Sequence, residues 1–141
     1  MNVSQIFTNK LRAEGKTGSI VNFSSVASKL ATSLGVAYSS LKAGLDHLTR
    51  NMAIELAPFN IRVNAINPGP VETPLLVEIT ENQARKYGDR YKVDDMLARV
   101  PSPNKTVPID DIVNTVLFLL CDAAVSLIGN TLTVDGGYSI A

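Results

Sequence analysis

Strand-like and helix-like segments alternate along this chain of 141 residues, and this alternation limits the fold more than any other feature. Short apolar runs at 18–25, 61–69 and 130–134 are separated by stretches with helical spacing. Parallel strands need a crossover segment between them, and that segment is usually a helix. The alternation therefore predicts an α/β fold with a parallel sheet, and we expect one domain over residues 1–141.

The clearest helical pattern covers residues 38–57. Pro58 is expected to end this helix, and Asn60 can adopt the left-handed turn before the next strand. The pattern is carried by apolar residues that recur three or four positions apart, namely Leu41, Leu45, Leu48, Met52 and Leu56.

Other elements are defined by their end signals. Residues 3–13 predict the end of a helix closed by Gly15, and Asp110 is expected to N-cap an amphipathic helix that runs through Cys121. The turn that starts at Asp135 should close the last strand. Residues 75–106 are more polar and less regular, with weak helical patterning at 76–99.

Composition excludes several classes of function. Thirteen basic and thirteen acidic residues cancel, which gives no electrostatic basis for binding nucleic acid or an anionic membrane. The longest apolar run is about 13 residues, too short for a bilayer.

The single cysteine, Cys121, rules out an internal disulfide and is expected to be buried. With no apolar leader, the chain is expected to be cytoplasmic. His47 is expected on the surface, and no second histidine or cysteine pair is present for a metal.

The candidate chemistry lies in the spacing of Tyr38 and Lys42. Residues at i and i+4 project from one face of a helix. A free phenol has a pKa of about 10. An ammonium beside it stabilises the phenolate and suits the pair to acid–base work near neutral pH. Ser25, at the end of a predicted strand, lies thirteen residues before Tyr38.

Two further motifs accompany this pair in a fixed order. The next strand closes with Asn67-Pro68-Gly69-Pro70, followed by Thr73, and the last strand closes with Asp135-Gly136-Gly137. Together these motifs resemble the short-chain dehydrogenase/reductase family, and the resemblance runs from about residue 3 to the C-terminus. It implies the C-terminal half of a Rossmann-type, doubly wound parallel sheet and hydride transfer between NAD(P) and a carbonyl or alcohol.

The resemblance also implies roles for individual residues. Ser25 would hydrogen-bond the substrate oxygen, Tyr38 would transfer the proton, and Lys42 would tune Tyr38 and hold the nicotinamide ribose. The residues that match the segment lining the nicotinamide are Pro68, Gly69, Val71 and Thr73.

Within the family the chain looks most like the L-xylulose (dicarbonyl) and carbonyl reductases. That likeness implies NADP(H) rather than NAD(H), a small sugar or dicarbonyl substrate, and a homo-oligomer, either a dimer or a tetramer. The charge-rich stretch at 81–95 aligns with the family's substrate lid, where Tyr87 and Tyr91 are candidates for substrate contact.

Parts of the family pattern are not found here. A glycine-rich turn after a first strand is absent, and Asn2 does not have the spacing of the family's catalytic asparagine. Leu41 replaces a small residue and is expected to pack within the helical stripe.

Without a neighbouring strand, the strand at 18–25 would become an open apolar edge. We therefore expect the chain alone to associate and to bind NADPH weakly. The alternative function is an inactive, truncated form that associates with full-length subunits.

Overall fold

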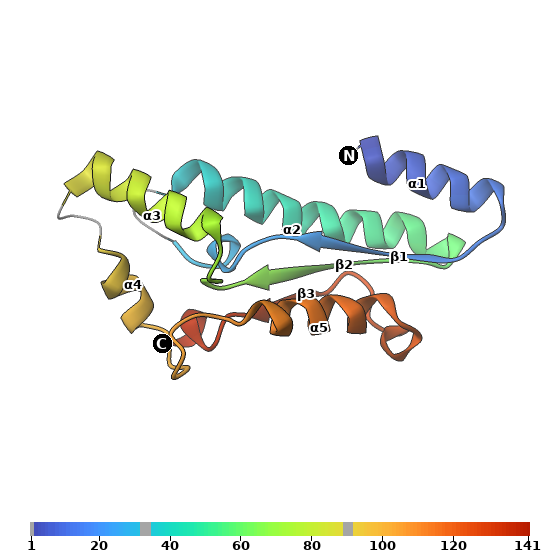
Figure 1. The fold of residues 1–141 in the computed structure, drawn as a ribbon. Helices are drawn as coiled ribbons and strands as arrows, with labels where there is room; N and C mark the ends of the chain where they lie inside the picture. Colours follow the sequence, from blue (N-terminus) through green and yellow to red (C-terminus); the bar gives the residue numbers. More distant parts are fainter. Residues whose placement is uncertain (1, 32–34, 89–91) are drawn as a thin grey trace.

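The computed structural model describes residues 2–31, 35–88 and 92–141. Its strands and helices alternate as the sequence predicts (Figure 1). The elements are α1 (Asn2–Ala13), β1 (Gly18–Phe23), α2 (Val36–Leu56), β2 (Ile61–Pro68), α3 (Pro74–Tyr87), α4 (Val93–Ala98), α5 (Ile109–Leu120) and β3 (Thr131–Val134). Short 3-10 turns follow several of them: η1 (Val26–Ser28), η2 (Ala57–Phe59), η4 (Asp122–Ala124) and η5 (Tyr138–Ile140).

The three strands form one parallel sheet in the order β1-β2-β3. Gly18 pairs with Ile61 at the start of β1, and Ala65 pairs with Thr131 at the start of β3. The central strand β2 is buried along nearly its whole length. These observations confirm the predicted α/β class with a parallel sheet. Among the described strands, β1 lies at an open edge, as expected.

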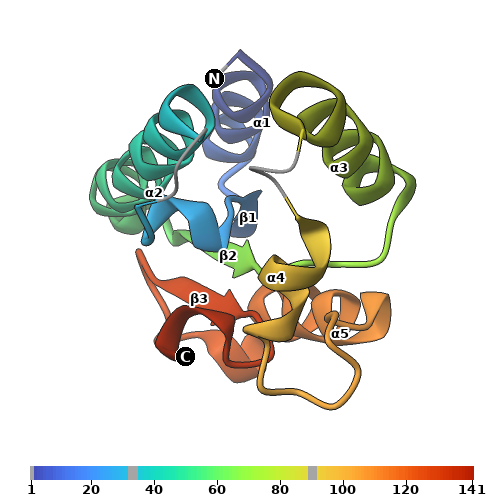
Figure 2. The same cartoon turned by 90° about the vertical axis from the view of Figure 1, so that its left-hand side faces the viewer.

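Helices cover both faces of the sheet. Figures 1 and 2 show α1 and α2 on one side and α5 on the other. The main apolar core lies between the sheet and α5, where Ile66 of β2 packs with Ile112 and Leu119. A smaller cluster of Val26, Val100 and Tyr138 lies at the end where the strands finish. The helices α3 and α4 also lie at this end (Figure 2).

The predicted ends of the elements agree with the backbone. Gly15, after α1, has φ +61°, and Asn60, after η2, has φ +55°. The helix predicted over 38–57 starts two residues earlier, at Val36. Residues 74–87 are more regular than the sequence suggested, because Thr73 caps α3 and Pro74 occupies its first turn.

The structure contradicts three predictions about α2 and α5. Leu41 is 74 % exposed, so it lies outside the packed stripe of α2. Cys121 is exposed because α5 ends at Leu120 and the backbone turns to an extended conformation there. Pro108, rather than Asp110, precedes α5, which places Asp110 in the first turn, where a carboxylate favours the helix dipole.

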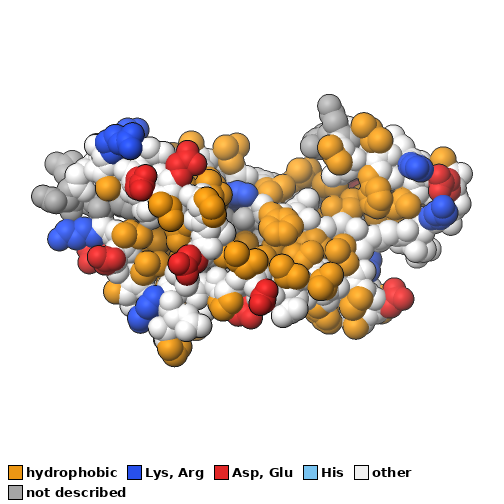
Figure 3. Space-filling model, viewed as in Figure 1, with side chains coloured by type: hydrophobic (Ala, Val, Ile, Leu, Met, Phe, Trp, Pro, Cys, Tyr) orange, Lys and Arg blue, Asp and Glu red, His pale blue; other side chains and the backbone are white. Residues whose placement is uncertain are grey.

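The surface is large for a chain of this mass. The chain exposes 8730 Å², whereas a compact monomer of 15.1 kDa is expected to expose about 7,100 Å². Apolar side chains gather around the region of β1 and α5 in Figure 3. Leu117, on the outer side of α5, is 58 % exposed. Within the described ranges, no helix combines the length and apolar character needed to cross a membrane.

Candidate active site

A cavity of about 520 Å³ lies where the three parallel strands end. Figure 2 looks onto this end of the molecule, with α2, α3 and α4 around it. In open α/β sheets, ligands bind outside the carboxyl ends of the strands. The seven residues to which the sequence analysis gives a catalytic or cofactor-binding role all line this one cavity: Ser25, Tyr38, Lys42, Pro68, Gly69, Val71 and Thr73.

Ser25 is placed by the turn that follows β1. Its backbone is extended, and its Oγ accepts a hydrogen bond of 3.1 Å from the amide of Ala27, which caps the 3-10 turn η1. A hydroxyl that accepts one bond keeps its own hydrogen for another partner. Ser25 can therefore donate to an oxygen in the cavity while its Oγ is held in place.

Tyr38 and Lys42 lie one turn apart near the start of α2. The Nζ atom of Lys42 is 5.7 Å from the centroid of the Tyr38 ring, and it donates a 2.8 Å bond to the carbonyl of Phe23. That bond fixes the ammonium at the end of β1, just before Ser25. Tyr38 lines the cavity and is 49 % exposed.

The segment after β2 packs closely against the residues at the end of β3. The Gly69 amide bonds the carbonyl of Val134 at 2.9 Å, and a Cβ at Gly69 would lie 2.7 Å from the Cα atom of Asp135. Only glycine fits this close approach. Thr73 Oγ1 accepts from the amide of Leu76 at 3.3 Å, which caps α3. Packing thus explains the Pro-Gly and Thr positions independently of any role toward a cofactor.

The remaining walls are mostly apolar. They come from Leu75, Leu76 and Ile79 of α3 and Met96 of α4. The charge-rich stretch at 81–95 therefore contributes less than expected, because the apolar first turns of α3 face the cavity. Tyr87 is not among the lining residues, and Tyr91 lies outside the described residues.

Tyr138 is a cavity residue that the sequence analysis missed. It is buried in η5, and the guanidinium carbon of Arg99 lies 5.0 Å from its ring centroid. The signal was available, because Tyr138 follows the turn that ends β3 and therefore lies at the same edge of the sheet as Ser25.

Asp135 organises the turn that carries Tyr138. Its carboxylate accepts bonds from the amides of Gly137 at 3.0 Å and Ser139 at 2.8 Å. Burial raises the pKa of Asp135, but hydrogen bonds from Ser139 and Gly137 outweigh it and hold the pKa below its usual value.

The cavity suits part of a dinucleotide. Lys42 is the only charged side chain among the described residues that line it. Apolar walls beside Tyr38 and Lys42 fit an aromatic ring and an adjoining sugar. A pyrophosphate is usually held by several cations or by amides at a helix N-terminus, and the described lining offers one cation. The residues present therefore fit the nicotinamide end of the group.

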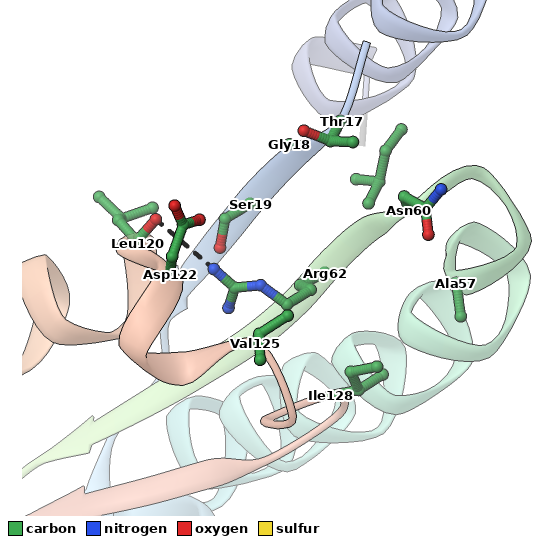
Figure 4. Close-up of a pocket in the computed structure, with 11 residues that line it drawn as sticks. Thr17, Gly18, Ser19, Ala57, Asn60, Arg62, Leu120, Asp122, Val125 and Ile128 are labelled. Atoms are coloured by element: carbon green, nitrogen blue, oxygen red, sulfur yellow. Dashed lines mark hydrogen bonds between the residues drawn. The ribbon is translucent and has the colours of Figure 1, made fainter. Parts of the chain in front are cut away.

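A second cavity, of about 400 Å³, lies at the opposite end of the strands (Figure 4). Its lining includes Arg62, which donates to the carbonyls of Leu119 at 2.8 Å and Cys121 at 3.1 Å. These bonds satisfy the end of α5. The arginine is thus occupied by a structural task, and we assign the candidate site to the first cavity. In the described part of the chain, no cluster of three acidic, histidine or cysteine side chains is placed to hold a metal.

The α/β fold brings Ser25, Tyr38 and Lys42 to one cavity, as the family resemblance implies. A family model described as enoyl-(acyl carrier protein) reductase matches residues 1–139. The chain belongs to the short-chain dehydrogenase/reductase family.

Curated relatives place it near reductases of small carbonyl compounds. The chain is 42 % identical to the L-xylulose reductase of Mus musculus over 96 % of its own length and 52 % of that protein. It is 39 % identical to the D-erythrulose reductase of Gallus gallus, covering 100 % of this chain and 54 % of that protein. The chain thus spans about half the length of the curated relatives it matches.

Solved structures of dehydrogenases and reductases also match this chain over about half of their own length. Sorbitol-6-phosphate 2-dehydrogenase from Erwinia amylovora superposes with a TM-score of 0.84 at 25 % identity, over 96 % of this chain and 54 % of that one. A variant of actinorhodin polyketide ketoreductase, solved with NADPH, gives 0.80 at 29 % identity, over 93 % and 50 %.

Proposed function

We propose that this chain carries the proton-transfer site of an NADPH-dependent reductase that acts on a small sugar or dicarbonyl. The observation that carries the proposal is the meeting of Ser25, Tyr38 and Lys42 in one cavity at the carboxyl ends of the strands. The relatives support the substrate class, since they include L-xylulose, D-erythrulose and NADPH-dependent carbonyl reductases.

The proposed mechanism assigns one task to each side chain. The substrate carbonyl oxygen accepts hydrogen bonds from Ser25 and Tyr38, and Tyr38 gives that oxygen its proton. Bound NADPH would supply the hydride to the carbonyl carbon. Lys42 stabilises the phenolate that proton transfer leaves on Tyr38, and holds the nicotinamide ribose together with Tyr38. The segment with Pro68, Gly69, Val71 and Thr73 would face the nicotinamide ring.

The same proposal extends to the cofactor, the cellular location and the oligomeric state. We assign NADP(H) rather than NAD(H), a cytoplasmic location and a homo-oligomeric state to this chain. The open β1 edge and the exposed apolar face of α5 favour a second candidate function, in which the chain associates with full-length subunits without turning over substrate.

The test compares NADPH oxidation by the purified chain with diacetyl and with L-xylulose, against two tyrosine variants. Tyr38→Phe removes the proposed acid and should lower the rate at least about 100-fold, the lower end of general acid–base effects. Tyr87→Phe is the matched control, since Tyr87 does not line the cavity, and it should keep the parent rate.

The outcomes separate the two functions. Equal rates for the parent and Tyr38→Phe would reject the catalytic proposal. A parent chain that is inactive but co-sediments with a full-length xylulose reductase would support the second function instead.

A further inference from the structure

We infer that Asp46 is the positioning residue of this site, the group that holds Ser25 in register with the helix of Tyr38 and Lys42. This inference deepens the proposed function and rests on it for the catalytic role of Ser25. It concerns a residue that lies in the interior behind the cavity and does not line it.

Asp46 lies one turn after Lys42 on α2 and is only 5 % exposed. A buried carboxylate is costly unless it is paired or hydrogen-bonded. No cation forms an ion pair with Asp46 within the described ranges, where the one such pair joins Lys16 and Glu14. The carboxylate is held by neutral donors from two other segments, so it connects α2 to both of them.

Those donors are the side chains of Ser28 and Asn67. Ser28 Oγ lies 2.6 Å from Asp46 Oδ2, and Asn67 Nδ2 lies 2.9 Å from the same oxygen and 3.1 Å from Oδ1. Ser28 belongs to the turn η1, and Asn67 belongs to β2. The carboxylate therefore joins three separate parts of the fold: the catalytic helix, the serine turn and the central strand.

The side chains of Ser28 and Asn67 also contact the carbonyl oxygen of Ser25. Ser28 Oγ is 2.7 Å from the Ser25 carbonyl oxygen, and Asn67 Nδ2 is 3.1 Å from it. On its other side, Ser25 Oγ accepts from the Ala27 amide. Ser28 has one hydroxyl hydrogen, which it can donate to Asp46 or to Ser25, whereas Asn67 Nδ2 has two and can donate to both. The hydroxyl of Ser25 is thus held by the Ala27 amide, and its carbonyl is held through the Asn67 amide that Asp46 orients.

The orientation of Asn67 shows which contact is dominant. Its Nδ2 faces Asp46, Ser28 and Ser25, and its Oδ1 is buried with no hydrogen-bond partner among the described residues. Turning the amide over would place Oδ1 against a carboxylate, where two acceptors repel. The fold therefore keeps an unsatisfied acceptor so that Nδ2 can bridge Asp46 and Ser25.

The experiment measures hydrogen exchange of single amides in the purified chain. The Ala27 and Ser28 amides report on the serine turn, because they bond the Oγ and the carbonyl of Ser25. The Gly129 amide, bonded to Val63 at 2.8 Å, reports on the opposite end of the sheet.

Asp46→Asn should accelerate exchange at Ala27 and Ser28 by about tenfold, the effect of one lost hydrogen bond, and leave Gly129 within about twofold of the parent. Asp111→Asn, an exposed acid on α5, is the matched control and should change none of the three. Ser28→Ala removes the hydroxyl that lies between the Asp46 carboxylate and the Ser25 carbonyl, so it should also accelerate exchange at Ala27 and provides the test if Asp46→Asn does not fold.

The outcomes are decisive in both directions. Equal acceleration at all three amides would make Asp46 a general stabiliser of the fold and overturn the inference, as would no acceleration at Ala27 and Ser28. If the parent chain is catalytically active, Asp46→Asn should lower kcat while the KM for NADPH stays within about twofold of the parent value. Absence of turnover in the parent counts against the proposed function alone, because the exchange pattern does not depend on activity.

Discussion

Replacing Arg62 with methionine should destabilise the fold through the far end of α5 without touching the cavity of Ser25. Arg62 starts in β2, and its guanidinium reaches the last carbonyls of α5 (Figure 4). The bonds to Leu119 at 2.8 Å and Cys121 at 3.1 Å have good length, whereas the one to Leu120, at 3.5 Å, is weak. The final carbonyls of a helix have no partner within the helix, so this side chain supplies a C-cap.

The magnitude follows from those two good bonds. A hydrogen bond from a charged donor contributes about 1.5–3 kcal/mol when protected from water, and Arg62 is half-buried, so we take about 1 kcal/mol for each. Arg62→Met should thus lower the free energy of unfolding by about 2 kcal/mol. At about 3 °C per kcal/mol, the Tm falls by roughly 6 °C. Arg62→Lys keeps the charge near the helix end and can make one bond, so about half of the loss is expected.

Urea and thermal unfolding of the parent and three variants test this reasoning. The third variant is Arg50→Met, which removes an exposed arginine from α2 and should leave stability within about 0.5 kcal/mol of the parent. If Arg62→Met has the same free energy of unfolding and the same Tm as the parent, the capping argument is refuted. If Arg62→Lys matches the parent while Arg62→Met does not, a charge with a single hydrogen bond accounts for the effect.

Two other predictions concern pH and association. The lowered pKa of Asp135 contributes stability that is present above its unfolded pKa and lost as pH falls through the folded value. The Tm difference between the parent and Asp135→Asn should therefore be constant from neutral pH to about 5 and shrink below about 4, and a constant difference throughout would contradict it. The isolated chain should sediment as dimers or larger species, and Leu117→Glu on the exposed face of α5 should reduce association. A monomeric parent that binds NADPH with micromolar affinity would disprove this prediction.

Much of the architecture could be predicted because it depends on local patterns. Strand and helix periods located the segments, and the ends at Gly15 and Asn60 were readable because left-handed backbone favours those residue types. Because parallel strands end at one edge of a sheet, Ser25 and residues 68–73 lie at the same edge. The structure shows all of them around one cavity, and their chemical roles remain proposals.

The failures share a physical origin. An apolar stripe shows which face of a helix is apolar, but the covering of that face depends on a neighbour. Leu41 follows the pattern of packed residues, yet it is exposed, because nothing in the described chain covers that position. Cys121 was assigned to the core for the same reason, and the helix ends one residue before it.

The long-range polar contacts are a different case, because no local pattern marks them. Asp46 follows Lys42 by one turn and reads as an ordinary helix acid, and Asn67 reads as part of a turn. Thirteen residues separate Ser25 from Tyr38 in the chain, but that spacing does not set their distance in space. Their relative position depends on how α2, η1 and β2 are joined, and Asp46, Ser28 and Asn67 are among the side chains that join them. A catalytic motif can therefore be read from sequence while the contacts that align it must be taken from the structure.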